Sequence, residues 1–275
     1  MAVATVTTGR KSDKLQVQEA QRLAAAWGLL YVPREGRSLE QVRAEAAALG
    51  ASSPAVIVVQ PDGLCLHVGE IRFRYHPGMG LSRIRRLARG ERDWMLWAMD
   101  LREGDQVLDA TMGLASDLLV ASYAVGERGR AVGLESELLI ALIVKEGLAS
   151  YSDPSEDVVA AMRRIEVIHG DHRGYLRAAP SGSFDVVYFD PLFHKPIEAS
   201  SQIAPIRELA NPAPLEDAVL KEAARVARRR VVVKDRRDGP YATSGRFDEV
   251  VGGKKSRICF CVLRVDGAQR ETTKG

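Results

Sequence analysis

The sequence predicts an α/β protein in which a doubly wound parallel sheet ends in an antiparallel hairpin and follows a small α+β domain. After residue 104, short apolar runs alternate with segments of helical periodicity, which is typical of parallel strands joined by helices. Near the C-terminus, two β-rich runs flank a Gly-Gly-Lys-Lys turn and predict the hairpin. Residues before 90 lack this regular alternation. We therefore expect a small α+β domain over 1–90 and the doubly wound domain over 91–275.

The N-terminal region predicts two helices, a hairpin and a helical connector. Helical spacing gives the first helix an apolar face made by Leu15, Ala20, Leu23 and Trp27. The second helix begins after Ser38, which forms a capping box with Gln41, and it ends at Gly50. Two β-rich runs around residues 61–63 predict the hairpin. The connector covers residues 80–101.

The second domain predicts five parallel strands with helices between them. The apolar runs that indicate strands lie at 106–109, 131–134, 165–168, 184–189 and 230–234. Segments with helical spacing lie at 116–125, 137–150, 172–178 and 215–227. This alternation predicts a Rossmann-like sheet, whose strand order stays open. Functional sites of such sheets lie at the carboxyl ends of the strands, so polar residues that end the strands are the candidates.

Composition disfavours several classes of protein. The chain has 275 residues, of which 46% are hydrophobic, so a full core can form. No apolar run approaches the ~18 residues of a membrane helix, and the N-terminus lacks the apolar core of a signal peptide. The cysteines Cys65, Cys259 and Cys261 lack the spacing of zinc ligands. We therefore expect a cytoplasmic protein with reduced cysteines, no metal and no membrane contact.

The first candidate site lies at the ends of the first two strands of the second domain. Asp109 ends one strand and Glu135 ends the next, and the turn after Asp109 holds Thr111 and Gly113. Carboxylates at neighbouring strand ends, with a glycine turn between them, predict a nucleoside pocket. The turn lacks Gly-x-Gly-x-x-Gly, which disfavours a dinucleotide. The alternative is a structural turn, with Asp117 as an acid favoured at a helix start.

Asp171 follows the third predicted strand and suits the amino group of an adenine. His169 and His172 flank it, but no other residue offers ligand spacing with them, so a metal site is disfavoured. The acids and the backbone N–H groups of the first turn suit a nucleoside with a cationic amino acid end. These features together predict a pocket for S-adenosyl-L-methionine.

A second motif follows the fourth apolar run, where Asp190 and Pro191 precede Leu192 and Phe193. An amino group can donate to Asp190, while Pro191 stiffens the turn and Phe193 stacks on a base. The motif resembles the Asp/Asn-Pro-Pro-Tyr/Phe motif of methyltransferases that act on nucleobase amino groups, with Leu192 in place of the second proline. We expect Asp190, Pro191 and Phe193 to form the catalytic loop. A surface turn with a buried Phe193 is the alternative.

Basic residues cluster in two segments, and such clusters suit contacts with RNA phosphates. The first segment, over 72–92, includes Arg83, Arg85, Arg86 and Arg89. The second, over 228–237, includes Lys234. We expect these four arginines of the first segment, and the small domain over 1–90, to contact RNA. The alternative for both clusters is an ordinary solvated face.

Together these motifs resemble the RsmJ-like family of small-subunit ribosomal RNA guanine-N2 methyltransferases, which are class I S-adenosylmethionine-dependent enzymes. The resemblance rests on VLDATMGLASD, GLESELLIALIVKEGL, HGD, VVYFDPLFHKP and RVVVK, and it spans most of residues 104–235. It implies S-adenosyl-L-methionine as cofactor and ribosomal RNA as partner. It also implies cofactor contacts by Ser116, Asp117, Glu135, Ser136, Asp171, His172 and Asp190. Ser116 stands where the family has an arginine.

We therefore expect an enzyme that methylates the exocyclic N2 of a guanine in ribosomal RNA. Direct transfer is expected, because a sulfonium is an activated donor and no cysteine near the motifs supports covalent catalysis. The target base must be flipped out or unpaired to reach the pocket. One alternative is a methyltransferase for a small molecule or a protein amide. Another is an RNA-binding module that senses the cofactor without turnover.

Overall fold

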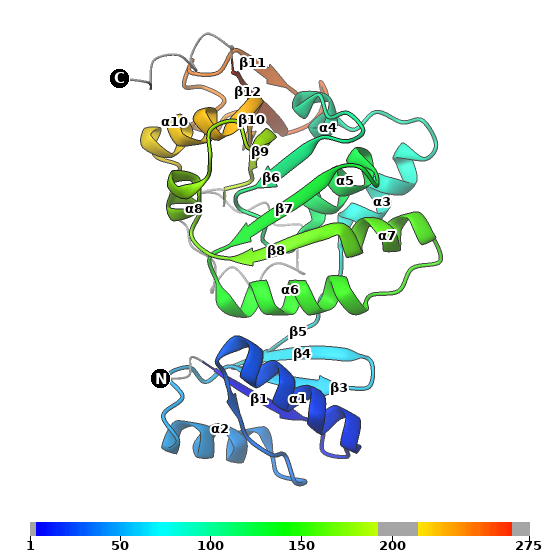
Figure 1. The fold of residues 1–275 in the computed structure, drawn as a ribbon, viewed down its shortest axis with the longest axis vertical. Coiled ribbons are helices and arrows are strands. Elements are labelled where there is room, and N and C mark those ends of the chain that lie inside the picture. The colour runs from blue at the N-terminus through cyan, green and yellow to red at the C-terminus, as the bar shows by residue number, and fades with distance from the viewer. Residues whose placement is uncertain (1–3, 192–213, 266–275) are drawn as a thin grey trace. The chain divides into compact units, whose positions relative to one another are not determined.

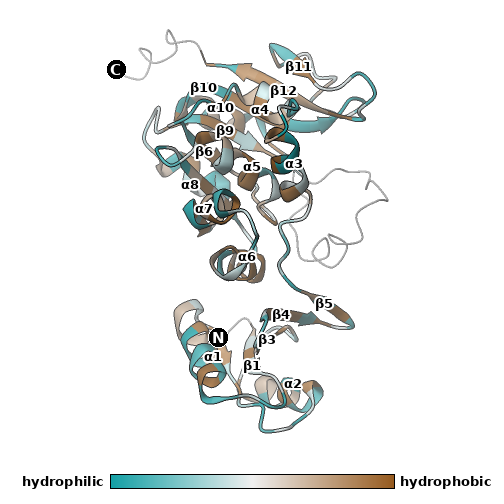
Figure 2. Ribbon diagram, turned by 90° about the vertical axis from the view of Figure 1, so that its right-hand side faces the viewer, coloured by the Kyte–Doolittle hydropathy of each residue, from teal (hydrophilic) through white to brown (hydrophobic). Residues whose placement is uncertain are grey.

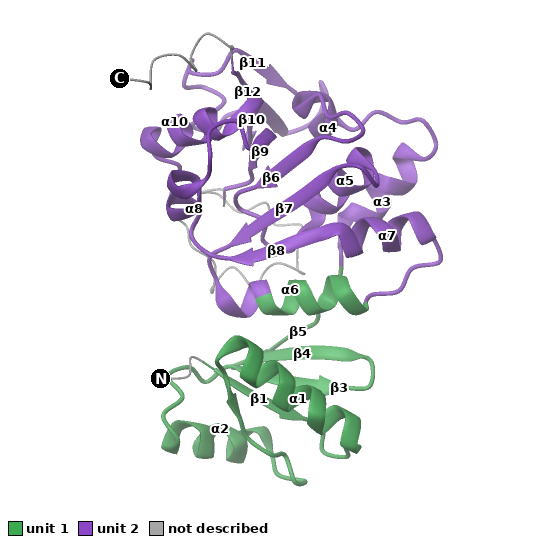
Figure 3. Cartoon of the chain, in the orientation of Figure 1, with its two compact units in different colours: residues 1–76, 142–150 green, residues 77–141, 151–275 purple. Residues whose placement is uncertain are grey.

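The computed structural model describes residues 4–191 and 214–265 of the chain. They form two compact units, one of residues 1–76 with 142–150 and one of residues 77–141 with 151–275 (Figure 3). Each unit has its own sheet. The assignment of RNA contact to the first unit and of catalysis to the second stays a prediction.

The first unit contains a five-stranded mixed sheet with the order β2-β1-β3-β4-β5. Its strands are β1 (Thr5–Thr8), β2 (Leu30–Tyr31), β3 (Val56–Gln60), β4 (Gly63–Val68) and β5 (Ile71–Phe73). Strand β1 runs parallel to β2 and β3, while β3, β4 and β5 are successively antiparallel. The hairpin predicted around residues 61–63 is therefore confirmed, and β1 and β2 are additions that periodicity did not indicate.

Two helices of the first unit begin with capping boxes. Helix α2 (Leu39–Ala48) starts at Ser38 with Gln41 as its partner, as predicted. Helix α1 (Lys14–Trp27) starts at Asp13 and buries Ala20, Leu23 and Ala24. The prediction for Leu15 was wrong, because its side chain is 74% exposed. With about 100° per residue, Leu15 lies about 140° around the helix from Ala20 and so misses the buried face.

The second unit contains a seven-stranded sheet with the order β11-β12-β10-β9-β6-β7-β8 (Figure 1). Its strands are β6 (Gln106–Asp109), β7 (Arg130–Glu135), β8 (Ile165–His169), β9 (Phe184–Phe189), β10 (Ala227–Arg236), β11 (Glu249–Val251) and β12 (Ile258–Arg264). Strands β8, β7, β6, β9 and β10 are parallel, and β12 is antiparallel to both β10 and β11. The predicted fold class is confirmed.

Helices cover both faces of this sheet. They are α3 (Met79–Leu87), α4 (Trp94–Met99), α5 (Ser116–Val125), α7 (Glu156–Arg164), α8 (His172–Ala178) and α10 (Asp217–Val226). Helix α6 (Leu138–Ser150) is divided between the units, because its residues 142–150 belong to the first. Helices α8 and α10 pack together on one face, and α3, α5 and α7 pack in a row on the other (Figure 1). The predicted connector is split into α3 and α4, and α7 was not predicted. None of the described helices combines the length and apolar character needed to cross a membrane.

The strand order places a switch point between β6 and β9. From β6 the chain adds β7 and β8 on one side and then returns to add β9 and β10 on the other. The central strands are hydrophobic (Figure 2), and Val107, Val186 and Val187 are fully buried. At such a point the loops after neighbouring strands diverge and leave room for a ligand at the carboxyl edge. The candidate residues of the sequence belong to this edge.

Candidate functional site

The loop after β6 is pinned to the strands on both sides. The Ala110 amide donates to the Tyr188 carbonyl at 2.8 Å, and the Met112 amide donates to the Leu134 carbonyl at 2.9 Å. Gly133 on β7 permits this close approach, since a Cβ there would overlap the Met112 side chain. Gly113 has a φ of 51°, and nothing lies within 4 Å of where its Cβ would be. The backbone at Gly113 is therefore open to a ligand.

Glu135 closes one side of this loop from the end of β7. The residue is 8% exposed, and its carboxylate accepts hydrogen bonds from the amides of Gly113 at 3.1 Å and Glu137 at 2.8 Å. The Ser136 hydroxyl lies 3.5 Å from the same carboxylate. Burial raises the pKa of Glu135, although the two amides oppose this shift. The structure thus places a buried acceptor next to the open backbone of Gly113.

Thr111 joins the first loop to the Asp-Pro motif. Its hydroxyl oxygen accepts from the Asp190 amide at 2.6 Å, and its own amide donates to Asp109 at 3.1 Å. Asp109 is 2% exposed, and burial together with the nearby Asp117 raises its pKa well above the ordinary value. Two motifs that lie 79 residues apart are therefore held at one edge of the sheet.

Asp190 lies directly after β9, with 31% of its side chain exposed. Its Oδ2 accepts from the ammonium group of Lys234 at 2.7 Å. Burial raises the pKa of Asp190, and Lys234 opposes that shift. Pro191 follows it and is partly exposed. The predicted stacking residue Phe193 lies outside the described residues.

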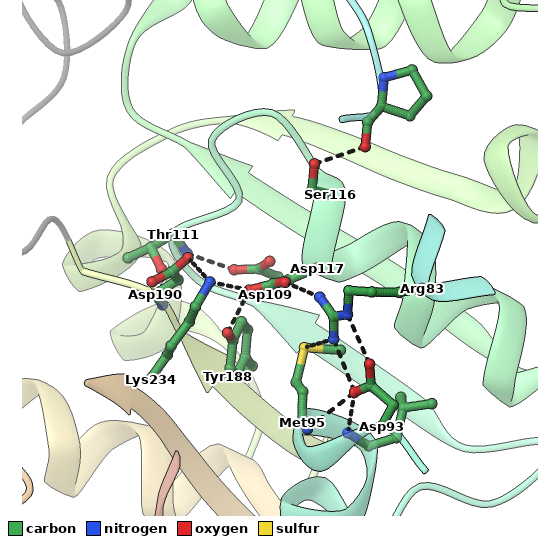
Figure 4. Close-up of polar contacts among 12 residues, drawn as sticks. Arg83, Asp93, Met95, Asp109, Thr111, Ser116, Asp117, Tyr188, Asp190 and Lys234 are labelled. Carbon is green, nitrogen blue, oxygen red and sulfur yellow. Dashed lines mark hydrogen bonds and ion pairs between the residues drawn. The ribbon is translucent and has the colours of Figure 1, made fainter. Parts of the chain in front are cut away.

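A chain of alternating charges runs inward from Asp190 (Figure 4). Lys234 on β10 donates to Asp190 and also to Oδ2 of Asp117, at 2.9 Å. The Tyr188 hydroxyl donates to the same Asp117 oxygen at 2.6 Å, and Arg83 binds the other oxygen. Burial favours the neutral form of Asp117, but Lys234 and Arg83 outweigh it and hold its pKa below the ordinary value.

Arg83 does not belong to the exposed arginine cluster in which the sequence placed it. Its side chain is 16% exposed, and its guanidinium group also donates to Asp93 at 2.7 and 2.9 Å. In contrast, the side chains of Arg85 and Arg86 are 62% and 59% exposed, and Arg89 is exposed as well. Arg85 pairs at 3.4 Å with Asp153, whose side chain is 7% exposed, and Arg86 pairs with the exposed Glu91. We therefore correct the candidate nucleic-acid surface to Arg85, Arg86 and Arg89.

Sequence reasoning also grouped Lys234 with surface cations and missed its place in the site. One signal was available: Lys234 directly follows Val231, Val232 and Val233, which are all fully buried. A lysine that directly follows such a buried run needs a counter-charge if it is buried as well. Asp117 and Asp190 hold the pKa of Lys234 above its ordinary value despite burial, which acts in the opposite direction.

The remaining predicted residues have partners within the protein. The Ser116 hydroxyl donates to the Pro77 carbonyl at 2.8 Å. Asp171 caps α8 and pairs with Arg173, which lowers the pKa of Asp171 to about 2. The His172 ring meets Phe189 edge to face at 5.9 Å, and burial lowers its pKa. Across residues 4–191 and 214–265, no three His, Cys, Asp or Glu side chains gather as metal ligands.

Known proteins share this sequence pattern and fold. Residues 67–261 match the family described as "Putative SAM-dependent methyltransferase". The chain is 38% identical over 236 residues to "Uncharacterized protein YpiP" of Bacillus subtilis, with 86% of this chain and 90% of that protein covered. It is 29% identical over 221 residues to "Ribosomal RNA small subunit methyltransferase J" of Pseudomonas paraeruginosa, covering 77% of this chain and 80% of that protein.

A solved structure shares the fold over nearly the whole length. The SAM-dependent methyltransferase NGO1261 of Neisseria gonorrhoeae superimposes with a TM-score of 0.63 over 96% of each chain. The two sequences are 18% identical, so this likeness concerns the fold alone.

The charge chain predicts that Asp117→Asn destabilises the second unit. The substitution leaves Arg83 and Lys234 without a shared buried counter-charge, so the free energy of unfolding should fall by about 3–5 kcal/mol at pH 7. Because the pKa of Asp117 is lowered by folding, its contribution is present above the ordinary aspartate pKa and is lost as pH falls below it. Urea unfolding at pH 7 and at pH 2.5, which lies below the ordinary aspartate pKa, measures this difference.

The exposed Asp217, whose side chain is 64% accessible, provides the control. Asp217→Asn should change stability by no more than about 0.5 kcal/mol. Equal stability of Asp117→Asn and the parent at pH 7 would contradict the importance of the charge chain.

Proposed function

The chain belongs to the S-adenosylmethionine-dependent methyltransferase family, with S-adenosyl-L-methionine as its cofactor, and we propose that it methylates the exocyclic N2 of a guanine in small-subunit ribosomal RNA. The observation that carries this proposal is the partly open carboxylate of Asp190, held beside Pro191 at the switch point of the sheet. The relatives named small-subunit ribosomal RNA methyltransferases support the choice of RNA.

The residues at the sheet edge fit the cofactor. Glu135 is a buried carboxylate that can accept from the ribose hydroxyls, and Ser136 lies beside it. Gly113 offers open backbone next to Glu135, and the acids Asp109 and Asp190 suit a cationic ligand. We assign the ribose to Glu135 and Ser136, and the amino acid end to the loop of Asp109, Thr111 and Gly113.

The other residues predicted to contact the cofactor lie around these cofactor-binding residues. We assign Asp171 and His172 to the adenine side of the pocket, because both begin α8 at the end of β8. Ser116 and Asp117 begin α5, and their polar atoms already bond to other parts of the protein. We therefore place Ser116 and Asp117 in the wall of the pocket, where they support the residues that touch the cofactor.

The bound cofactor supplies a methyl group on a positively charged sulfur, which is already activated for transfer. Asp190 accepts an N–H of the guanine amino group and so turns the nitrogen lone pair toward the methyl carbon. The lone pair forms the new N–C bond, while the electrons of the broken C–S bond stay on sulfur. The nitrogen then loses one proton, which the Asp190 carboxylate accepts and passes to solvent. Burial raises the pKa of Asp190 and makes it a better acceptor for this proton.

The RNA is proposed to lie along α3 and the residues that follow it. Arg85, Arg86 and Arg89 are exposed there, and Arg83 of the same helix reaches the charge chain of the site. Arginines on this outer face can bind phosphates, while the target base is flipped toward Asp190.

Transfer of a labelled methyl group tests the acceptor. The purified protein is incubated with labelled S-adenosyl-L-methionine and, separately, with bulk ribosomal RNA, a small-molecule extract and total protein. We expect label in RNA, recovered as N2-methylguanosine after digestion. Label in small molecules or in protein would instead indicate a methyltransferase for a small molecule or a protein amide. Binding of cofactor and RNA without any transfer would indicate an RNA-binding module that senses the cofactor.

Glu135→Ala should weaken cofactor binding by about 1–3 kcal/mol, because the ribose hydroxyls lose their buried acceptor. Isothermal titration calorimetry with S-adenosyl-L-methionine measures this effect. Glu137→Ala, two residues further on, serves as the control and should bind as the parent does. Unchanged affinity in Glu135→Ala would remove Glu135 from the cofactor pocket.

The double variant Arg85→Glu, Arg86→Glu should bind RNA more weakly and with a flatter dependence on salt, because fewer counterions are released. Cofactor affinity should not change. The control is the double variant Arg102→Glu, Arg128→Glu, which changes the net charge by the same amount at side chains that are 68% and 77% exposed. It should lose less RNA affinity. If both double variants lose the same affinity and slope, α3 does not form a specific RNA surface.

Asp190→Asn should lower the single-turnover rate of methyl transfer by ~10²–10³, in line with the loss of one preorganised polar contact. The amide keeps the shape of the side chain, so the affinities for cofactor and RNA should stay within about threefold of the parent. Asp62→Asn, at a hairpin aspartate with a 70% exposed side chain, provides the control. Transfer by Asp190→Asn at the parental rate would show that this loop is not the catalytic centre.

A further inference from the structure

We propose that Lys234 is the positioning residue of the methyl transfer, a role that rests on the proposed function of Asp190. Its ammonium group holds one oxygen of the Asp190 carboxylate and leaves the other oxygen to the acceptor amine. Asp117, which Arg83 binds from the other side, in turn holds Lys234. The residue that touches the acceptor is Asp190, and Lys234 acts through it.

The sheet register brings the two side chains together. Val232 of β10 pairs with Tyr188 of β9, and Lys234 and Asp190 each lie two residues further along. Side chains two residues apart lie on the same face of a strand. The Lys234 ammonium group therefore meets Oδ2 of Asp190 at 2.7 Å with only 21% of its side chain exposed. Neighbouring parallel strands thus fix the pair.

The Lys234 ammonium group also binds a second carboxylate, that of Asp117. Asp117 Oδ2 lies 2.9 Å from the ammonium nitrogen, and Asp117 is itself bound by Arg83 and by the Tyr188 hydroxyl. Arg83 is anchored by two hydrogen bonds to Asp93 (Figure 4). Among the described residues, Oδ1 of Asp190 is the carboxylate oxygen at the end of this chain that no side chain binds. We assign that oxygen to the acceptor.

Lys234 is not the proton acceptor itself. Two carboxylates share its ammonium group and favour its charged form, so it has no lone pair to offer. Its effect on Asp190 is electrostatic and geometric. A fixed positive charge at 2.7 Å favours the ionised form of Asp190 and restricts its rotation.

Other charges act on Asp190 from each element packed around it. Arg83 of α3 favours the ionised carboxylate, whereas Asp117 of α5 disfavours it. Asp109 of β6 and the Tyr188 hydroxyl of β9 are also electrostatically coupled to Asp190. Lys234 is the cation in direct contact. Its removal should therefore raise the pKa of Asp190, and the carboxylate would be protonated at a pH where the parent is active.

The test is the pH profile of single-turnover methyl transfer to the RNA that the parent methylates. Lys234→Met should lower the rate about 10²-fold at pH 7 and move the acid limb of the profile upward by about 1 unit or more. Lys234→Arg retains the positive charge and should keep the acid limb near its parental position. Lys221→Met, at an exposed lysine of α10, is the matched control and should keep the parental profile.

A second readout does not depend on the acceptor. Carbon NMR of the labelled Asp190 carboxyl group reports its pKa in the enzyme with cofactor alone. Lys234→Met should raise that pKa, and Arg83→Gln, which leaves Lys234 in place, should raise it by a smaller amount. This readout separates the two proposals, because a parent that methylates no RNA would refute the proposed acceptor and leave the carboxyl titration measurable.

A uniform loss of rate in Lys234→Met, with the acid limb unmoved, would reduce Lys234 to a structural role and overturn the inference. An Asp190 pKa that is unchanged in Lys234→Met would overturn it equally. If Lys234→Met does not fold, the same rate profile and carboxyl titration are measured on Lys234→Gln, which also removes the positive charge.

Discussion

The bridge between Asp117 and Asp190 is the interaction on which the site depends. Two carboxylates stand at one sheet edge because the ammonium group of Lys234 lies between them, at 2.9 and 2.7 Å. Removing these charges from water costs several kcal/mol for each ion, and pairing only offsets that cost when the geometry is good. Apolar residues could fill the same space without such a cost. The retention of charge here therefore agrees with a catalytic use of Asp190.

The topology of the sheet makes this arrangement possible. Strand β9 lies between β6 and β10, so the end of one central strand can contact both neighbours. Thr111, after β6, binds the Asp190 amide, and Lys234 of β10 binds its carboxylate. The same loop after β6 reaches Glu135 at the end of β7 through the Gly113 amide. The proposed nucleoside pocket and the proposed acceptor-binding acid thus share one short loop.

Much of this could be predicted from the sequence because the signals are local. Apolar runs and helical spacing located the strands of the second unit, and acids at strand ends located Asp109, Glu135 and Asp190. Strand order was not predictable, because periodicity does not report which strands pair. Helix α7 (Glu156–Arg164) was also missed, and Leu15 was wrongly placed on a buried helix face. Which side chains are buried depends on what each element packs against, and local spacing does not report this.

The charge chain escaped prediction because it joins residues far apart in the sequence. Arg83 and Lys234 looked like members of basic surface clusters, and only the packing of α3, α5 and β10 turns them inward toward Asp117. A lysine that directly follows three buried valines was the single local hint. Arg83 lies close in sequence to the exposed Arg85 and Arg86, so the sequence did not indicate that Arg83 alone forms a buried ion pair.

Nucleoside mass spectrometry of small-subunit ribosomal RNA from a strain that lacks this gene tests the central claim most directly. We predict the loss of one N2-methylguanosine, which returns when the parental gene is supplied and stays absent when the supplied gene carries Asp190→Asn. Ribosomal RNA with an unchanged content of N2-methylguanosine in the deletion strain would contradict it.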